Sequence, residues 1–243
     1  MTHPFELSQD IELGATPEQV WDAIATGPGI DSWYMGRSEV SPAEAVRTVV
    51  SNWSIDSRVT AWEPGSRLAY GGEESDTDRF LAYEFLIEGR NQGSTVLRMV
   101  AHGFLPGDDW AEEFEAMTKG GLMYWHTLVA YVSHFAGRTA TPLEVDGPLP
   151  ESWDAAWLGI GRALGLDRRP ATGDAVRLEI APGQVVDGIV FYANPDVAGV
   201  RTEGGLYRFI KGFHRPMLAF HEIFDGPVDE SHWTGWLQRA CAA

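Results

Sequence analysis

Apolar and polar residues alternate along the first part of the chain with the period of β-strands. Phe5, Leu7, Ile11 and Leu13 mark a first strand, and further strand-like segments follow at 46–53, 58–62, 67–70, 79–88 and 94–104. The separator Glu63-Pro64-Gly65-Ser66 suits a type II turn, because Pro and Gly occupy its central positions. Short turns between successive strands predict an antiparallel meander.

Helical patterns lie on both sides of this meander. Thr16 suits a helix N-cap and Pro17 the first helical position, which predicts a helix that ends at Gly27-Pro28-Gly29. A short second turn is predicted over residues 30–34. From 110 to 132 apolar residues recur at helical spacing, so we predict one long amphipathic helix.

The second half of the chain repeats this order of elements in shorter form. Residues 137–149 are rich in Thr, Pro and Gly and are interpreted as a linker. A helix to Leu164 is predicted next, then strands at 175–180, 185–192, 200–211 and 217–224, and a last helix at 230–240. Pro150-Glu151-Ser152-Trp153-Asp154-Ala155 also echoes residues 17–23 with one residue deleted.

These patterns predict a domain at 1–137, a linker at 138–148 and a shorter α+β lobe at 149–243. The echo and the shared element order favour a degenerate second copy. An unrelated α+β extension remains the alternative, because residues 139–147 offer only a poor first strand.

The opening strand, the segment Ala15-Thr16-Pro17-Glu18-Gln19-Val20-Trp21-Asp22-Ala23-Ile24 and Trp33 beyond it resemble homologues of the heat-shock-protein-90 ATPase activator. These belong to the START-like, or SRPBCC, superfamily. The resemblance continues through 59–68 and the helix from Trp110, and covers residues 5–135. It implies an α+β helix-grip fold, in which a curved antiparallel sheet wraps a long C-terminal helix and two short helices close one end. Family members often keep a cavity for an apolar or aromatic small molecule between sheet and helix.

The charge balance excludes several partner classes. The chain has 18 Lys and Arg against 35 Asp and Glu, a formal charge of −17, which disfavours nucleic acid and anionic membranes. Cys241 is the only cysteine, so neither an intramolecular disulfide nor a cysteine-based zinc site is expected. The acidic start at 1–13 and the lack of a long apolar run favour a cytoplasmic protein without membrane insertion.

Few residues suggest catalytic or metal chemistry. His126 and His134 do not converge on the long helix, and neighbours His221 and Glu222 on a predicted strand should point to opposite faces. Gly159-Ile160-Gly161-Arg162-Ala163-Leu164-Gly165 lacks a preceding strand, so it indicates close helix packing and a Gly C-cap rather than a phosphate loop. We therefore expect no metal and no cofactor.

His102 is the one ambiguous histidine. It alternates with Val96, Arg98 and Val100 on the last strand of the meander, whereas Leu97, Met99 and Ala101 occupy the other face. The sequence leaves open whether His102 is a base inside a pocket or a surface residue.

Aromatic residues are the strongest functional signal, because ten Trp are many for 243 residues. Each ring taken singly fits ordinary core packing, but together they suit a small-molecule pocket. Gly120-Gly121 in the long helix would leave room for a ligand or for the second lobe, and Trp153, Trp157, Trp233 and Trp236 are expected to bury a contact between lobes. The expected ligand-binding residues are Trp33, Trp53, Tyr70, Tyr83, Phe85, His102, Phe114, Met117, Gly121 and Trp125.

The sequence thus predicts non-catalytic binding of an apolar or aromatic small molecule. Two alternatives stay open. One is a polyketide cyclase or aromatase-like enzyme that uses His102 or Tyr83 for proton transfer. The other is an interaction module of the chaperone-activator type, with a protein partner. The oligomeric state is left open.

Overall fold

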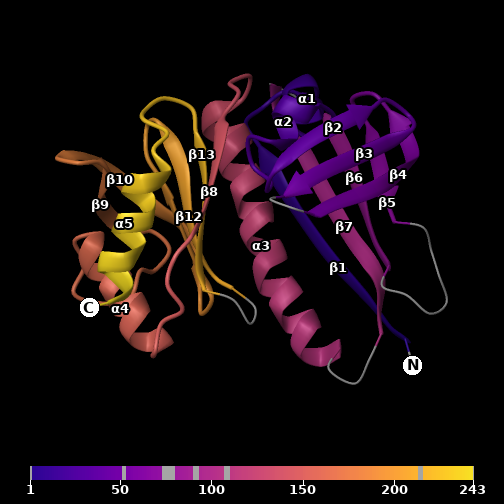
Figure 1. Cartoon of the computed structure of the whole chain (residues 1–243). Coiled ribbons are helices and arrows are strands. Elements are labelled where there is room, and N and C mark those ends of the chain that lie inside the picture. The colour runs from indigo at the N-terminus through magenta and orange to yellow at the C-terminus, as the bar shows by residue number, and fades with distance from the viewer. Residues whose placement is uncertain are drawn as a thin grey trace. The chain divides into compact units, whose positions relative to one another are not determined.

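The computed structural model of the chain describes residues 2–50, 53–72, 80–89, 93–106, 110–212 and 216–242. Its residues form two compact units (Figure 1). The first lobe comprises Met1–Thr118 and Tyr131–Thr139, and the second lobe comprises Lys119–Ala130 and Ala140–Ala243. No helix in the described part combines the length and the apolar character that crossing a membrane requires.

The first lobe contains a seven-stranded antiparallel sheet in the order β1-β7-β6-β5-β4-β3-β2. The strands are β1 (Thr2–Leu13), β2 (Arg37–Ser41), β3 (Ala45–Val50), β4 (Trp53–Glu63), β5 (Arg67–Gly71), β6 (Phe80–Gly89) and β7 (Thr95–Pro106). The predicted meander is confirmed, and Gly65 has the positive φ of 76° that a type II turn requires. Strand β2 was not predicted, because its buried position Ser38 is polar and lies 3.0 Å from the Thr48 hydroxyl.

Three helices belong to this part of the chain: α1 (Pro17–Ala25), α2 (Gly27–Ile30) and α3 (Trp110–Phe135). Thr16 is confirmed as the N-cap of α1, since its hydroxyl accepts from the Gln19 amide and the Gln19 side chain accepts from the Thr16 amide. The prediction for Gly27-Pro28-Gly29 was wrong in part. These residues end α1, but they also form α2, which is capped by the Thr26 side chain.

One face of the first sheet, which we call the inner face, contacts α1 and the first turns of α3. The Trp62 ring of β4 lies 5.2 Å from Trp21 of α1, and the Phe5 ring of β1 lies 5.6 Å from Phe114 of α3. Directly paired residues of antiparallel strands share a face. A row of such pairs runs across the sheet from Trp62 of β4 to β1, where it ends on the same face as Phe5. The inner face therefore includes Leu68, Tyr70, Tyr83, Phe85, Met99 and Ala101.

The opposite face of the first sheet, the outer face, is charged. Its exposed residues include Glu6, Asp10, Glu39, Arg47, Asp56, Arg58, Arg67, Glu88, Arg98 and His102. This separation of charged and apolar faces is the pattern expected of a sheet that covers a core on one side only.

The second lobe contains a six-stranded antiparallel sheet in the order β8-β13-β12-β11-β10-β9. The strands are β8 (Thr141–Asp146), β9 (Ala175–Ala181), β10 (Gln184–Asn194), β11 (Val197–Arg201), β12 (Gly205–Lys211) and β13 (Met217–Ile223). Strand β8 lies inside the segment predicted as a linker and buries Leu143 and Val145. Residues 200–211, predicted as one strand, belong to β11 and β12, which are joined by a turn at 202–204.

Both lobes follow one topology, in which the first strand pairs with the last strand of the meander and a helix follows. The second lobe contains α4 (Trp153–Ala163) and α5 (Glu230–Cys241) in addition to the α3 segment Lys119–Ala130. The sequence echo does not mark equivalent cap positions, because Thr16 precedes Pro17 directly whereas the α4 cap, Ser152, follows Pro150 by two residues.

Aromatic side chains fill the core of the second lobe. Trp157, Trp233 and Trp236 are buried there, and the Trp236 ring stacks on Phe209 at 4.8 Å. These tryptophans, expected to bury a contact between lobes, therefore belong to the second lobe's own core. The predicted helix packing is confirmed at Gly161, where a Cβ would overlap the Arg168 carbonyl oxygen, and Gly165 has the positive φ of a C-cap.

Candidate functional site

Three of the predicted ligand-binding residues meet on the inner face of β5 and β6. Tyr70 pairs directly with Tyr83 across these strands, and their ring centroids are 5.8 Å apart. The Phe85 ring lies 6.2 Å from Tyr70 and 6.5 Å from Tyr83. Alternation along β6 places residues 83 and 85 on the same face. We call these three residues the aromatic triad.

The members of the triad differ in burial. Phe85 is 1% exposed, whereas Tyr70 and Tyr83 are only half-buried. Burial nevertheless raises the pKa of Tyr70, and the neighbouring Tyr83 raises it further. Burial also raises the pKa of Tyr83, although a hydrogen bond with Tyr34 acts to lower it. Both phenols therefore keep their protons at neutral pH and can donate hydrogen bonds.

The two hydroxyls also differ in their partners. Tyr83 shares a hydrogen bond with Tyr34, which follows α2. Within the described ranges, no residue forms a hydrogen bond with the Tyr70 hydroxyl. Tyr70 thus presents a donor that no described residue uses.

Other inner-face residues were missed as site residues by the sequence. Phe5, Leu7 and Gln9 of β1 are half-buried, and Leu7 pairs with Ala101 of β7. Their alternation predicted a strand, but β1 pairs with β7, about ninety residues further along the chain. A local sequence pattern does not show which strand will be its partner. Phe114, which the sequence did single out, contacts Phe5.

The structure decides the position of His102. Its side chain is exposed on the outer face, together with Arg98, whereas Leu97, Met99 and Ala101 are buried on the inner face. Expecting His102 to contact an inner-face ligand was therefore wrong. A side chain on the outer face cannot share a site with Tyr70 and Tyr83.

The remaining predicted residues have other surroundings. Trp33 is buried, and its indole nitrogen donates to the Ala23 carbonyl oxygen at 2.9 Å, which ties it to α1. Trp125 is buried, whereas Gly121 is exposed, and a Cβ added there would meet no atom within 4 Å. The side chains of Trp53 and Met117 lie outside the part of the structure that is described.

The second lobe contains a buried ion pair on the face of its sheet opposite α4 and α5. Arg208 and Glu222 pair in this position, with side chains 0% and 2% exposed. The Arg208 Nε also donates to the Phe220 carbonyl oxygen at 3.1 Å, and its guanidinium lies 5.0 Å from the centre of the Tyr124 ring. Both side chains are sealed from water, and burial raises the pKa of Glu222 to about 8 although Arg208 acts to lower it.

His221, the neighbour of Glu222, points into the aromatic core, so the predicted opposite orientation of the two side chains is confirmed. Its ring lies 4.1 Å from that of Trp233, and its Nδ1 accepts from the Arg208 amide at 3.3 Å. Burial lowers the pKa of His221 to about 3. The imidazole is therefore neutral in the folded protein.

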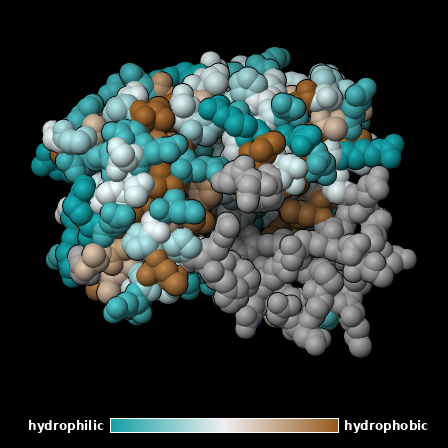
Figure 2. Space-filling view, in the orientation of Figure 1, coloured by the Kyte–Doolittle hydropathy of each residue, from teal (hydrophilic) through white to brown (hydrophobic). Residues whose placement is uncertain are grey.

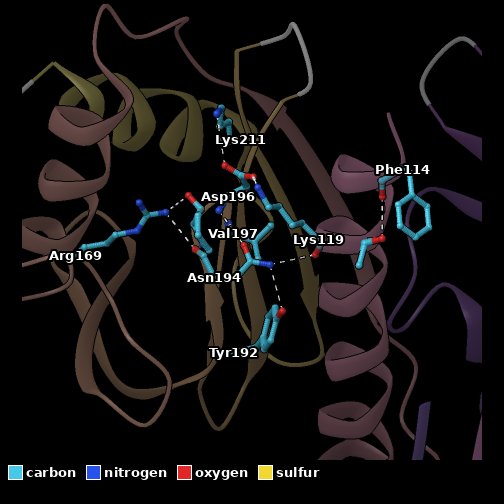
Figure 3. A network of polar contacts seen from close by, with 10 residues as sticks. Phe114, Lys119, Arg169, Tyr192, Asn194, Asp196, Val197 and Lys211 are labelled. Atoms are coloured by element: carbon cyan, nitrogen blue, oxygen red, sulfur yellow. Dashed lines mark hydrogen bonds and ion pairs between the residues drawn. The ribbon is translucent and has the colours of Figure 1, made fainter. Parts of the chain in front are cut away.

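A polar network fixes the turn between β10 and β11 to the middle of α3 (Figure 3). The Asn194 amide nitrogen donates to the Lys119 carbonyl oxygen at 3.3 Å, and Asp196 contacts Lys119 at 2.9 Å and Lys211 at 3.5 Å. Burial alone would raise the Asp196 pKa, but the two ammonium groups hold it below its ordinary value. The Tyr192 ring of β10 also stacks on His126 of α3 at 4.2 Å.

These polar side chains do not form a metal centre. In the described residues, no group of three His, Cys, Asp or Glu side chains is placed to hold a metal ion. The Lys119–Asp196–Lys211 contacts satisfy one another, so their evident role is to hold β10 and β11 against α3.

No protein family matches the chain, and no curated protein matches it. Solved structures are similar to it. Protein MLL2253 from Mesorhizobium loti is 20% identical and covers 54% of this chain and 98% of its own, with a TM-score of 0.46. The Aha1 dimer from Colwellia psychrerythraea is 16% identical, with coverages of 53% and 96% and a TM-score of 0.44.

A third similar structure extends over both lobes. The di-domain ARO/CYC protein BexL of the BE-7585A biosynthetic pathway is 12% identical, covers 98% of this chain and 99% of its own, and has a TM-score of 0.45. The strand order and helix positions observed here confirm the helix-grip fold predicted from the sequence.

Proposed function

We propose that the chain binds an apolar or aromatic small molecule on the inner face of the first lobe, without covalent chemistry. The observation that carries this proposal is the state of Tyr70 and Tyr83. Both rings keep accessible surface, yet their surroundings desolvate the hydroxyls strongly enough to raise their pKa. Side-chain surface that is accessible but poorly hydrated is typical of the wall of a binding pocket rather than of the outer surface of a protein.

The second lobe offers an internal comparison. The face of its sheet that packs on α4 and α5 is filled by the lobe's own rings, with Tyr207, Phe209 and Trp233 each no more than 1% exposed. On the first sheet the inner-face residues Phe5, Leu7 and Tyr70 stay half-buried. This contrast supports one ligand site, in the first lobe.

The chemistry of the inner face favours binding over catalysis. His102, the sequence's best candidate for a base, lies on the outer face. A phenol with a raised pKa is a weak acid and leaves almost no phenolate at neutral pH, so Tyr70 and Tyr83 are poor proton acceptors. These properties weaken the cyclase alternative.

The interaction-module alternative has less support from the surface. Among the described residues, the exposed large apolar side chains are scattered, and only Val185 and Ile189 share an element, β10; the others are Val49, Leu149, Leu158 and Val228. Apart from the grey atoms, Figure 2 shows mainly hydrophilic side chains with smaller hydrophobic patches between them. Single exposed apolar residues are normal on protein surfaces and do not indicate docking.

A matched pair of substitutions on β1 tests the proposal. Leu7 faces inward and is half-buried, whereas its neighbour Ser8 is exposed on the outer face. Leu7→Trp adds a bulky ring to the inner face in line with Ala101 and Tyr83, and Ser8→Trp adds the same side chain to the outer face. Binding of naphthalene derivatives to the wild type and both variants would be measured by isothermal titration calorimetry.

We expect the wild type and Ser8→Trp to bind and Leu7→Trp to lose binding, with all three proteins folded by circular dichroism. Equal binding by Leu7→Trp and the wild type would place the ligand elsewhere and overturn the proposal. Absence of binding by the wild type to every neutral aromatic probe would overturn it as well.

A further inference from the structure

The strand positions of the inner face share one chemical property, which is the absence of charge. Across β2 to β7, none of the described inner-face positions holds Asp, Glu, Lys or Arg, and the polar exceptions are hydroxyl groups such as those of Ser38, Thr48, Tyr70 and Tyr83. The charged residues of these strands alternate onto the outer face. An ion that entered this face would lose its hydration without gaining a counter-charge from the described positions of β2 to β7.

Tyr70 supplies the one hydrogen-bond donor of the aromatic triad that has no partner in the described part of the chain. Tyr83 is already engaged with Tyr34, and Phe85 has no polar group. A donor held in poorly solvated surroundings gains free energy when it meets an acceptor, because leaving it unpaired has a cost.

The triad also defines the shape that fits beside it. The Tyr83 and Phe85 rings are inclined by only 21°, whereas Tyr70 is inclined by 30° to Phe85 and by 47° to Tyr83, so only Tyr83 and Phe85 have similarly oriented faces. Rings arranged in this way stack best with another flat ring.

From these observations we infer that the ligand is an uncharged planar molecule that carries an oxygen acceptor, and that Tyr70 Oη donates a hydrogen bond to this oxygen. The inference rests on the proposed function and names the ligand class for the same site. Tyr70 then determines orientation and specificity, whereas the half-buried Tyr83 ring provides the stacking surface and the buried Phe85 supports it from within.

Four naphthalene probes separate the alternatives. They are 2-ethylnaphthalene, which has no acceptor; 2-acetylnaphthalene, which adds a carbonyl; 2-naphthoate, an anion; and (2-naphthylmethyl)trimethylammonium, a cation. Each is titrated by calorimetry into the full-length wild type, Tyr70→Phe and a matched control, Tyr192→Phe in the second lobe. Tyr70→Phe removes one hydroxyl and keeps the ring.

We expect the wild type to bind 2-acetylnaphthalene most tightly and the two ions most weakly. Tyr70→Phe should weaken 2-acetylnaphthalene binding by about twofold to tenfold, the range expected for one hydrogen bond, and leave 2-ethylnaphthalene unchanged. Tyr192→Phe should change neither affinity. A substitution that merely disturbed the fold would weaken both neutral probes alike.

The outcomes distinguish this inference from the proposed function. If both neutral probes bind but Tyr70→Phe changes the two affinities by the same factor, the inference is overturned and the proposed function stands. Tighter binding of 2-naphthoate or of the cation also overturns the uncharged class, the latter in favour of cation–π recognition by the rings. If none of the probes binds the wild type, the proposed function fails and the inference fails with it.

Discussion

Tyr70 and Tyr83 face each other across β5 and β6 with ring centroids 5.8 Å apart, and among the described residues only the Tyr83 hydroxyl has a hydrogen-bond partner, Tyr34. This pair lies on a sheet face whose described strand positions, from β2 to β7, hold no Asp, Glu, Lys or Arg, while the reverse face of the same strands is charged. The chemistry of the first lobe follows from this relationship, because a neutral phenol in apolar surroundings can orient a ligand but cannot readily accept a proton.

Replacing Tyr70 with Phe tests the burial of its hydroxyl in the absence of ligand. Because burial raises the Tyr70 pKa, the folded variant and the folded wild type should show equal tyrosinate absorbance at about pH 10. In denatured protein, where a tyrosine titrates near its ordinary value, the variant should show less. A difference in the folded proteins as large as that in the denatured ones would contradict the burial of this group.

The same pKa shift predicts how stability depends on alkaline pH. A group whose pKa is raised in the folded state holds its proton more tightly there, so its contribution is fully present below the unfolded pKa of about 10 and is lost as pH rises above it. Urea unfolding at increasing pH should show a smaller loss for Tyr70→Phe than for the wild type. Parallel pH profiles would argue against the shift.

Gly121 should tolerate Ala and gain stability from it. It is an exposed residue within α3, and an added Cβ meets no atom within 4 Å, so helix propensity should raise the free energy of unfolding by up to about 1 kcal/mol. Gly161→Ala in α4 is the matched control, since its Cβ overlaps the Arg168 carbonyl oxygen. It should lower the free energy of unfolding in urea; stabilisation by both changes would refute the packing described for Gly161.

The pair of Arg208 and Glu222 should behave as a unit. Glu222→Leu leaves a fully buried guanidinium without its carboxylate and should lower the free energy of unfolding by about 3 to 5 kcal/mol. The double variant Arg208→Met with Glu222→Leu should recover most of this loss, because no buried charge remains. A double variant that loses the sum of the two single effects would show that the charges do not interact.

His221 makes the second lobe sensitive to acid. Its pKa is lowered to about 3, so the unfolded chain binds a proton that the folded chain does not, and stability should fall as pH drops from about 6.5 towards 3. His221→Gln keeps a polar side chain that does not titrate. Both proteins keep Glu222, so the difference between their unfolding free energies reports on His221 alone. As pH falls, the unfolding free energy of the wild type should decrease by more than that of the variant. A difference that does not change with pH would contradict the buried neutral imidazole.

Much of the local structure could be predicted because it depends on neighbouring residues. The cap at Thr16, the turn at Gly65 and the C-cap at Gly165 each rest on chemistry within a few residues, and the structure confirms all three. The opposite orientation of His221 and Glu222 likewise follows from the alternation of a strand. The shortest elements were harder, since β2 buries a polar Ser38 and β8 buries only Leu143 and Val145.

The sequence by itself determined the strands and helices of the first lobe, the two alternating sets of residues on β7 and the aromatic residues as the main functional signal. It could not decide which set faces inward, because period-two alternation is the same on both sides of a strand. The pairing of β1 with β7 and the contact of Phe5 with Phe114 made that decision, and placed His102 outside and Ala101 inside. Partners such as Arg208 and Glu222, or Tyr70 and Tyr83, are brought together by strand pairing, so only the tertiary structure could show them.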